Sequence, residues 1–270
     1  MRVAICQLRA GEDVEANLAV VDRLVRDAAA EAADLVTLPE YAGFLGGAWA
    51  DATAPLGQGR LERTLSALAT ELGVWIVGGT VAERDGDHVY DTTPVIAPDG
   101  EIVARYRKIH LFDVELPGQP PFRESATFTP GHELVTQETP AARLGLAICY
   151  DLRFPELFRG LMALGVDVMV VPSQFQHLTG EAHWHVLLRA RAIENQCYVV
   201  APAQWGAYGA PEHGRRSFGH SLIVGPWGEI VAEAPADGDV VIVAELDPAE
   251  LRRVRRVLPA LQHRRVGMVC

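Results

Sequence analysis

Apolar residues along the chain follow two periods that alternate from the N-terminus to about residue 246. Short apolar runs with little polar interruption predict buried strands. These runs lie at 2–8, 34–38, 74–79, 144–148, 166–172, 197–203 and 240–246. Between them, apolar residues recur at helical spacing, as Leu18, Val21 and Val25 do. This second period predicts amphipathic helices over 13–33, 61–72, 156–164 and 181–195.

Two turn signals add hairpins to this pattern. Pro98-Asp99-Gly100 separates the strand-like segments 88–96 and 101–107. Pro226-Trp227-Gly228 separates 221–224 from 229–234 in the same way. Strands that alternate with helices predict an α/β sandwich. Because 49% of the residues are hydrophobic, the chain suits one large domain, 1–270, that can bury most of its apolar surface.

Three of the predicted strands end on residues that can carry chemistry. One apolar run ends on Cys149, where a turn leads into the next predicted helix. A second delivers Glu40 just past a proline, and a third delivers Lys108 into a loop rich in proline and glycine. A cysteine at a sheet edge near a helix N-terminus is expected to favour the thiolate form. Taken singly, each residue also has an ordinary explanation, as a buried hydrophobe, a loop carboxylate or a solvated charge.

The segments around these residues resemble the motifs of one enzyme family. They are Arg105–Val114 around Lys108, Phe122–Ser125, Thr179–His185, Arg189–Gln196, Ser217–Ser221 and Pro226–Gly228. Several motifs in the right order are more specific than any one of them. The chain is therefore identified as a member of the nitrilase, or carbon–nitrogen hydrolase, superfamily. The resemblance implies an α-β-β-α sandwich of two mixed sheets packed face to face, with helices outside, assembled into a homodimer or larger homo-oligomer.

The resemblance also implies that Glu40, Lys108 and Cys149 are the catalytic residues, and these residue types fit the hydrolysis of an amide. Glu40, when desolvated, can accept the thiol proton. Lys108 and the backbone N–H of Tyr150 can stabilise the oxyanion of the tetrahedral intermediate. A thioester at Cys149 then forms and is hydrolysed by water. Glu124 is expected to orient Lys108 or the substrate, with a structural salt bridge as the alternative. This mechanism uses neither a metal nor an organic cofactor.

Within the superfamily, the chain is most similar to the deaminated-glutathione amidases. The similarity lies in Pro172–Phe175, Gln196–Val199, Ala203–Gly206 and Leu258–Arg265. It implies a metabolite-repair reaction that splits deaminated glutathione into 2-oxoglutarate and cysteinylglycine, with Gln174 and Phe175 in the substrate pocket. Two alternatives stay open: an ω-amidase that converts 2-oxoglutaramate to 2-oxoglutarate and ammonia, and an N-carbamoyl amino acid hydrolase.

The charge of the chain restricts its partners. A net charge of −11 argues against a general nucleic-acid binder and gives an anionic substrate no long-range attraction. Local cations must therefore anchor the substrate, and we expect Lys108 and one arginine, for which Arg153 is the candidate, to form a positive pocket. The basic C-terminal run, which includes Arg252, Arg255 and Arg264, is interpreted as a solvated helix face or an oligomer contact.

The compartment is predicted from what the chain contains. It begins directly with a strand pattern, and no stretch approaches the ~20 apolar residues of a membrane span. Its four cysteines show neither CxxC spacing nor a disulfide-dense pattern, which suits reduced thiols in the cytoplasm. Cys6 and Cys197 are predicted to lie in the core and Cys270 to be exposed.

Two further features of the helix 181–195 have ordinary interpretations. On a helix, His183 and His185 present their rings on different faces, and no cysteine lies at ligand spacing, so we expect no zinc site there. The family often has an acidic residue where this chain has His185. Arg189 and Arg191 point about 200° apart and are expected to form structural pairs.

A function of another class is also considered. The protein could be a non-catalytic scaffold or a thiol redox sensor on a hydrolase fold, since a fold does not determine a function. The intact set of Glu40, Lys108 and Cys149 argues against a scaffold. A sensor needs a resolving thiol near Cys149, and the sequence shows none.

Overall fold

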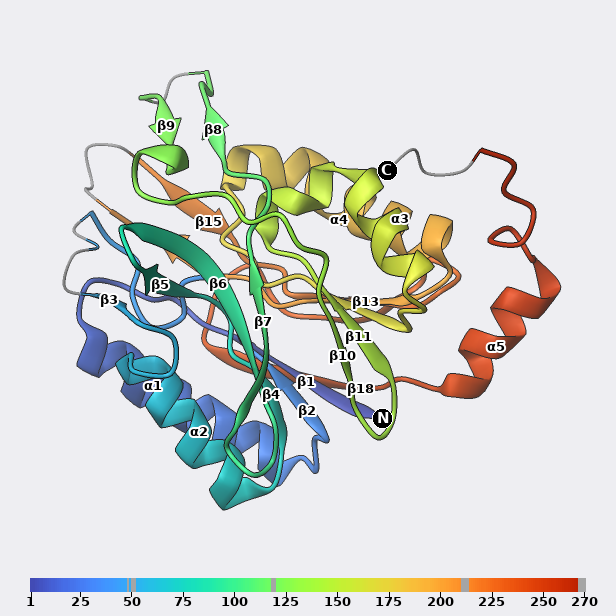
Figure 1. Cartoon of the computed structure of the whole chain (residues 1–270), viewed down its shortest axis with the longest axis horizontal. Helices are drawn as coiled ribbons and strands as arrows, with labels where there is room; N and C mark the ends of the chain where they lie inside the picture. The colour runs from blue at the N-terminus through green and yellow to red at the C-terminus, as the bar shows by residue number, and fades with distance from the viewer. Residues whose placement is uncertain (48, 50–51, 118–119, 210–213, 267–270) are drawn as a thin grey trace.

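The computed structural model describes residues 1–47, 49, 52–117, 120–209 and 214–266. Its strands form two large sheets that pack face to face (Figure 1). The first sheet has the order β18 (Val240–Glu245), β1 (Arg2–Gln7), β2 (Leu35–Thr37), β4 (Trp75–Val77), β6 (His88–Ile96), β5 (Val81–Asp85) and β3 (Thr53–Ala54), and β7 (Ile102–Arg107) also pairs with β6. The second has the order β10 (Thr136–Glu138), β11 (Arg143–Leu146), β12 (Val168–Val170), β13 (Tyr198–Ala201), β16 (Leu222–Val224) and β17 (Ile230–Glu233).

Both sheets combine parallel and antiparallel pairs. In the first, β1, β2 and β4 are parallel, whereas β18 joins β1 in antiparallel register. In the second, β11, β12 and β13 are parallel, and β16 and β17 continue the sheet as a hairpin. Two small ribbons, β8 (Asp113–Val114) with β9 (Phe122–Arg123) and β14 (Trp205–Ala207) with β15 (Arg216–Phe218), complete the strands.

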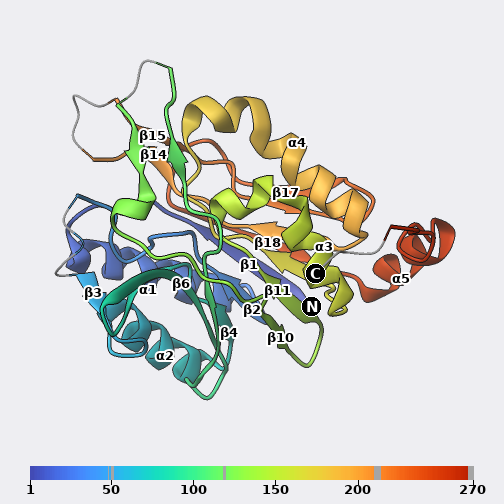
Figure 2. The same cartoon turned by 45° about the horizontal axis from the view of Figure 1, so that its top comes forward.

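Helices cover the outer face of each sheet. The helices α1 (Val14–Ala30) and α2 (Arg60–Leu72) lie on the first sheet, and α3 (Pro155–Ala163) and α4 (His177–Asn195) lie on the second (Figures 1 and 2). The last helix, α5 (Pro248–Val257), lies at the edge of the sandwich beyond the end of β18. Among the described residues, no helix combines the length and apolar character that a membrane crossing requires.

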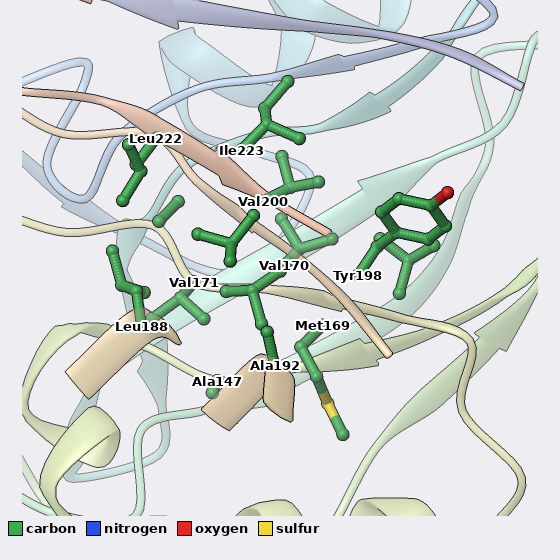
Figure 3. Packing of buried hydrophobic residues seen from close by; sticks show 14 of the residues in the cluster. Ala147, Met169, Val170, Val171, Leu188, Ala192, Tyr198, Val200, Leu222 and Ile223 are labelled. Atoms are coloured by element: carbon green, nitrogen blue, oxygen red, sulfur yellow. The ribbon is translucent and has the colours of Figure 1, made fainter. Parts of the chain in front are cut away.

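The alternation of side chains along the strands divides the core into layers. In β1, Val3 and Ile5 face the second sheet, and the intervening Ala4 and Cys6 pack with the residues of α1 and α2. On the other side, Leu188 and Ala192 of α4 belong to the same cluster as the valines of β12 and β13 (Figure 3). The central strands of both sheets therefore lie between two apolar layers, which confirms the predicted α-β-β-α sandwich.

The predicted elements are found with shifted ends. The strands are shorter than the apolar runs, because the runs continue into buried loops, as Val171 and Pro172 do after β12. Helix α4 begins at His177, one turn before the predicted start. Gly180 lies inside α4, and a Cβ there would approach the Phe218 ring to 2.4 Å, so the close packing of Phe218 requires a glycine at this position. The short strands β3, β5, β8, β9, β10, β14 and β15 were not predicted.

Candidate active site

Each of the three predicted catalytic residues follows a strand and is buried between the sheets. Glu40 lies just after β2, Lys108 directly after β7, and Cys149 at the start of a 3₁₀ turn that leads from β11 into α3. Glu124 opens another short 3₁₀ turn, Glu124–Ala126. Their exposed fractions are only 1% for Glu40, 2% for Lys108, 6% for Cys149 and 3% for Glu124. The fold therefore brings together four ionisable groups that are almost completely buried from solvent.

The backbone is strained at Cys149 and at the residue that follows Glu40. Cys149 has φ +42°, and Tyr41, directly after Glu40, has φ +62°, a left-handed conformation that side-chain-bearing residues rarely adopt. Gly79 lies against the Glu40 loop with φ +65°, and a Cβ on it would come within 2.1 Å of the Pro39 carbonyl oxygen. Strained backbone of this kind concentrates at functional sites, where the surrounding structure must hold it.

The Lys108 ammonium lies among three carboxylates. Its Nζ is 2.8 Å from Glu40 Oε1 and 2.7 Å from Glu124 Oε1. The Oδ2 atom of Asp91, a fully buried residue, lies 3.6 Å from the same nitrogen. These carboxylates are close enough together to hold a cation, and Lys108 supplies it. Glu124 is fixed in turn, because the Tyr41 hydroxyl donates to its Oε1 at 2.6 Å and the Phe112 N–H to its Oε2 at 2.5 Å.

The backbone of one residue, Gln174, links the carboxylate and the thiol. The N–H of Gln174 donates to Glu40 Oε2 at 2.5 Å, and the Cys149 thiol donates to the Gln174 carbonyl at 3.6 Å. Gln204 holds the Glu40 main chain, because its side-chain amide donates to the Glu40 carbonyl at 2.9 Å. The two reactive groups are therefore fixed side by side by backbone that the second sheet anchors.

Burial and charge set the protonation of this cluster. Burial, and then the neighbouring Glu124 charge, raise the pKa of the Glu40 carboxyl, although Lys108 opposes the shift. Burial also raises the pKa of the Asp91 carboxyl well above its usual value. For Lys108, burial favours the neutral amine, yet the surrounding carboxylates raise the pKa of the ammonium well above its usual value. Lys108 is therefore charged at neutral pH.

The expected resting thiolate at Cys149 is wrong. Burial, followed by the charge of Glu40, raises the pKa of the Cys149 thiol well above its ordinary value. The thiolate was predicted from the helix that follows Cys149, and the local sequence reveals neither the burial of the thiol nor the nearby Glu40 charge. The resting group is a thiol, so it needs a base when it attacks, and Glu40 is the adjacent carboxylate.

Two cavities adjoin this cluster and meet at Gln174. The smaller is lined by Cys149, Tyr150, Arg153 and Phe175. The Arg153 guanidinium lies 5.2 Å from the Phe175 ring and contacts His183 at 3.2 Å. The three residues predicted for the pocket, Arg153, Gln174 and Phe175, are thus gathered beside the thiol. Their binding of substrate stays a prediction, as does the role of the Tyr150 N–H.

The larger cavity contains residues that the sequence analysis missed. It has a volume of about 430 Å³ and is lined by Tyr41, Glu124, Gln174, Tyr208 and Arg215, among others. Arg215 stacks 5.1 Å from the Phe122 ring. The half-buried Tyr208 contacts the side chain of Gln176. Tyr208 directly follows β14 and Arg215 directly precedes β15. No apolar pattern predicts this short ribbon, and no sequence signal identifies the two residues.

The other predicted residues lie away from the catalytic cluster. Arg191 is buried and donates to the Leu152 carbonyl, and Arg189 donates to the Gly228 carbonyl, which confirms structural roles. Cys6 and Cys197 are fully buried in the core, as predicted. Cys270 lies outside the described residues.

Two arginines of α5 form ion pairs. Arg253 pairs with Glu250 on the exposed side of the helix. Arg255 reaches back to Asp167 at 3.0 Å and donates to the Val166 carbonyl. This part of the basic run is therefore a solvated helix face with one anchor to the body of the protein.

The chain is similar to curated amidases over nearly its whole length. The human deaminated glutathione amidase is 44% identical over 97% of this chain and 82% of its own length. The human omega-amidase is 36% identical over 98% of this chain and 95% of its own length.

Solved structures agree with this likeness. The C. elegans NitFhit protein superposes with a TM-score of 0.89 at 37% identity, over 98% of this chain and 65% of that protein. A Saccharomyces cerevisiae member of branch 10 of the nitrilase superfamily gives a TM-score of 0.86 at 34% identity, over 98% and 97% of the two chains. The sequence model of the carbon-nitrogen hydrolase family matches residues 2–256. Given this match and the geometry above, the chain belongs to the carbon-nitrogen hydrolase family.

Proposed function

We propose that the protein is a single-domain amide hydrolase in which Cys149 is the nucleophile, Glu40 the general base and acid, and Lys108 the oxyanion stabiliser. The observation that carries this proposal is the backbone of Gln174, whose N–H and carbonyl hold the Glu40 carboxylate and the Cys149 thiol together beside the Lys108 ammonium. A buried thiol with a raised pKa is inert alone, and it becomes a nucleophile when a fixed base removes its proton during attack.

The proposed reaction has two halves that use the same groups. As sulfur attacks the amide carbon, the thiol proton passes to Glu40 and the carbonyl oxygen becomes an oxyanion beside Lys108 and the Tyr150 N–H. The C–N bond then breaks, and Glu40 returns the proton to the leaving amine, which leaves a thioester at Cys149. A water molecule gives its proton to Glu40 and attacks the thioester, the C–S bond breaks, and the sulfur regains a proton.

Glu124 is proposed as a positioning residue. It holds Lys108 at 2.7 Å and is itself fixed by Tyr41 and Phe112, so it keeps the ammonium beside the reacting carbonyl. The buried Asp91 adds a further acidic group that the sequence analysis did not identify. No apolar period or motif marks it, because its place beside Lys108 follows from the pairing of β6 with β7.

For the substrate we propose deaminated glutathione, because the curated relatives of greater identity carry that activity in their names. The cations at the cavities support a substrate with two carboxylates. Arg153 lies beside the thiol, and Arg215 lines the cavity of about 430 Å³, which has room for a dipeptide leaving group. The second candidate is 2-oxoglutaramate, favoured by the likeness to the human omega-amidase.

The substrate is tested by turnover of the purified protein with each compound, with Cys149→Ala as the matched control. Both reactions release 2-oxoglutarate, and only 2-oxoglutaramate releases ammonia. We expect Cys149-dependent turnover with a higher kcat/KM for deaminated glutathione. A higher kcat/KM for 2-oxoglutaramate would keep the mechanism and replace the substrate, whereas undiminished turnover by Cys149→Ala would refute the nucleophile.

We further propose that the protein is a homodimer or a larger homo-oligomer in the cytoplasm. Leu178, Val186 and Ile193 are exposed along one side of α4, by 47%, 67% and 47%, and Trp227 adds a further exposed apolar side chain nearby. An apolar face of this kind supports a contact between copies. Cys6, Cys149 and Cys197 are unpaired thiols, which supports a reducing compartment. Sedimentation of the protein and of Val186→Glu tests the contact: the variant should dissociate.

A further inference from the structure

A second cluster of chemistry-bearing side chains lies outside the catalytic site. His185 comes from α4, His220 from the segment before β16, and Glu233 from β17. His185 Nε2 lies 2.9 Å and His220 Nδ1 2.8 Å from one oxygen, Glu233 Oε1. The three atoms all lie within 4.8 Å of one another. Two imidazoles and a carboxylate thus converge on one point.

The cluster is both accessible and held in place. The exposed fractions of the side chains are 31% for His185, 27% for His220 and 32% for Glu233, so an ion from solvent can reach them. His220 has φ +54°, and the turn before it is tight, because a Cβ on Gly219 would lie 1.9 Å from the Ala236 carbonyl oxygen. The Phe218 ring packs 4.6 Å from the His220 ring and 6.0 Å from the His185 ring.

We propose that His185, His220 and Glu233 form a binding site for a divalent transition-metal ion such as Zn²⁺, with solvent in the remaining position. Two histidine nitrogens and one carboxylate oxygen are a ligand set that this class of ion prefers. In a tetrahedral site with bonds of about 2.0–2.2 Å, ligand atoms lie roughly 3.3–3.6 Å apart. The two histidine nitrogens lie 2.8 and 2.9 Å from Glu233 Oε1, so each of these distances needs to increase by only about 0.5 Å. Glu233 lies on the edge strand of its sheet, and its side chain is 32% exposed, so the carboxylate can shift by this amount.

This site could not be predicted from the His-x-His spacing. His183 contacts Arg153 at 3.2 Å and is not a member of the cluster. The proposed site therefore departs from the expectation that this helix carries no zinc ligand. The ligands that do meet His185 come from two other elements, 35 and 48 residues further along the chain. The site is also separate from the catalytic chemistry, because the Phe218 segment, whose N–H donates to the Phe175 carbonyl at 2.9 Å, lies between them.

The test uses untagged full-length protein with Cys149→Ala and Cys270→Ser, so that neither the nucleophile nor the C-terminal thiol binds the metal. Calorimetry with Zn²⁺ and the visible absorption of bound Co²⁺ measure affinity and coordination. We expect one site, and His185→Ala, His220→Asn or Glu233→Gln should each weaken binding at least roughly tenfold. Asparagine is chosen at position 220 because it tolerates the left-handed backbone.

The matched control is His132→Ala. His132 is an exposed histidine 3.9 Å from a glutamate, Glu133, and it lacks the second imidazole. This control should keep the parent affinity, and circular dichroism verifies that each variant is folded. The proposal is overturned if the parent binds more weakly than a Kd of about 1 mM, if the ligand variants bind as tightly as the parent, or if the control loses as much affinity as they do.

Discussion

Replacement of Lys108 by methionine removes the cation around which the buried carboxylates are arranged. At an effective dielectric constant of about 20, each pair at 2.7–2.8 Å contributes roughly 6 kcal/mol before the desolvation of either partner is counted. Removing one member of a buried pair leaves an uncompensated charge, and in proteins generally this lowers the free energy of unfolding by about 3–5 kcal/mol. We expect that loss for Lys108→Met in urea unfolding.

The same variant should lose catalysis for a second reason. Without its oxyanion donor, kcat should fall about 100- to 1,000-fold. The loss of Lys108 also removes the charge that opposes protonation of Glu40, so the base is neutral over a wider pH range. Release of 2-oxoglutarate from deaminated glutathione measures both effects.

A double variant separates charge balance from catalysis. Lys108→Met with Glu124→Gln removes one carboxylate together with the cation, so it should recover about 2 kcal/mol of the lost stability. Its kcat should stay low, because no ammonium faces the oxyanion. Lys108→Met with kcat within about tenfold of the parent, or a double variant with the parent's kcat, would refute the role assigned to Lys108.

Three further outcomes are expected. In the pH profile of kcat/KM, the acid limb should have its midpoint above pH 4.5, because burial raises the pKa of the Glu40 base. Glu124→Gln removes a neighbouring negative charge, so it should move this midpoint to lower pH. A shift to higher pH would contradict the expectation. In thermal unfolding, Gly79→Ala should destabilise the fold by about 2–5 kcal/mol, because the new Cβ would clash with the Pro39 carbonyl. The control Gly73→Ala has the same left-handed backbone but open space around it, so it should lose only about 1–2 kcal/mol. Arg215→Gln should raise KM about tenfold for deaminated glutathione and less for 2-oxoglutaramate, and equal increases would place Arg215 against the acyl group instead.

The sequence predicts the parts of the site that lie next to regular elements. Glu40, Lys108 and Cys149 each follow an apolar run, so the pattern of strands already brings them towards the ends of strands. The segment that carries Glu124 resembles a family motif, and the structure places its carboxylate on Lys108.

What the sequence does not predict depends on contacts between distant segments. Asp91 reaches Lys108 only through the register of β6 and β7, and Tyr208 and Arg215 enter the cavity from a short ribbon. The predicted protonation state of Cys149 was wrong for the same reason, because the burial of the thiol and its closeness to Glu40 arise only in the folded protein. Likewise, the need for a glycine at position 180 comes from the packing of Phe218, a residue far along the chain, against α4.

The proposed mechanism requires that a covalent acyl group forms on Cys149 during turnover. Rapid-quench mass spectrometry of the parent protein with deaminated glutathione should show a 2-oxoglutaryl adduct on the peptide that contains Cys149, formed and lost as fast as 2-oxoglutarate appears. Cys149→Ala should show neither adduct nor turnover. Turnover of the substrate with no adduct at Cys149, together with undiminished turnover by Cys149→Ala, would contradict the account.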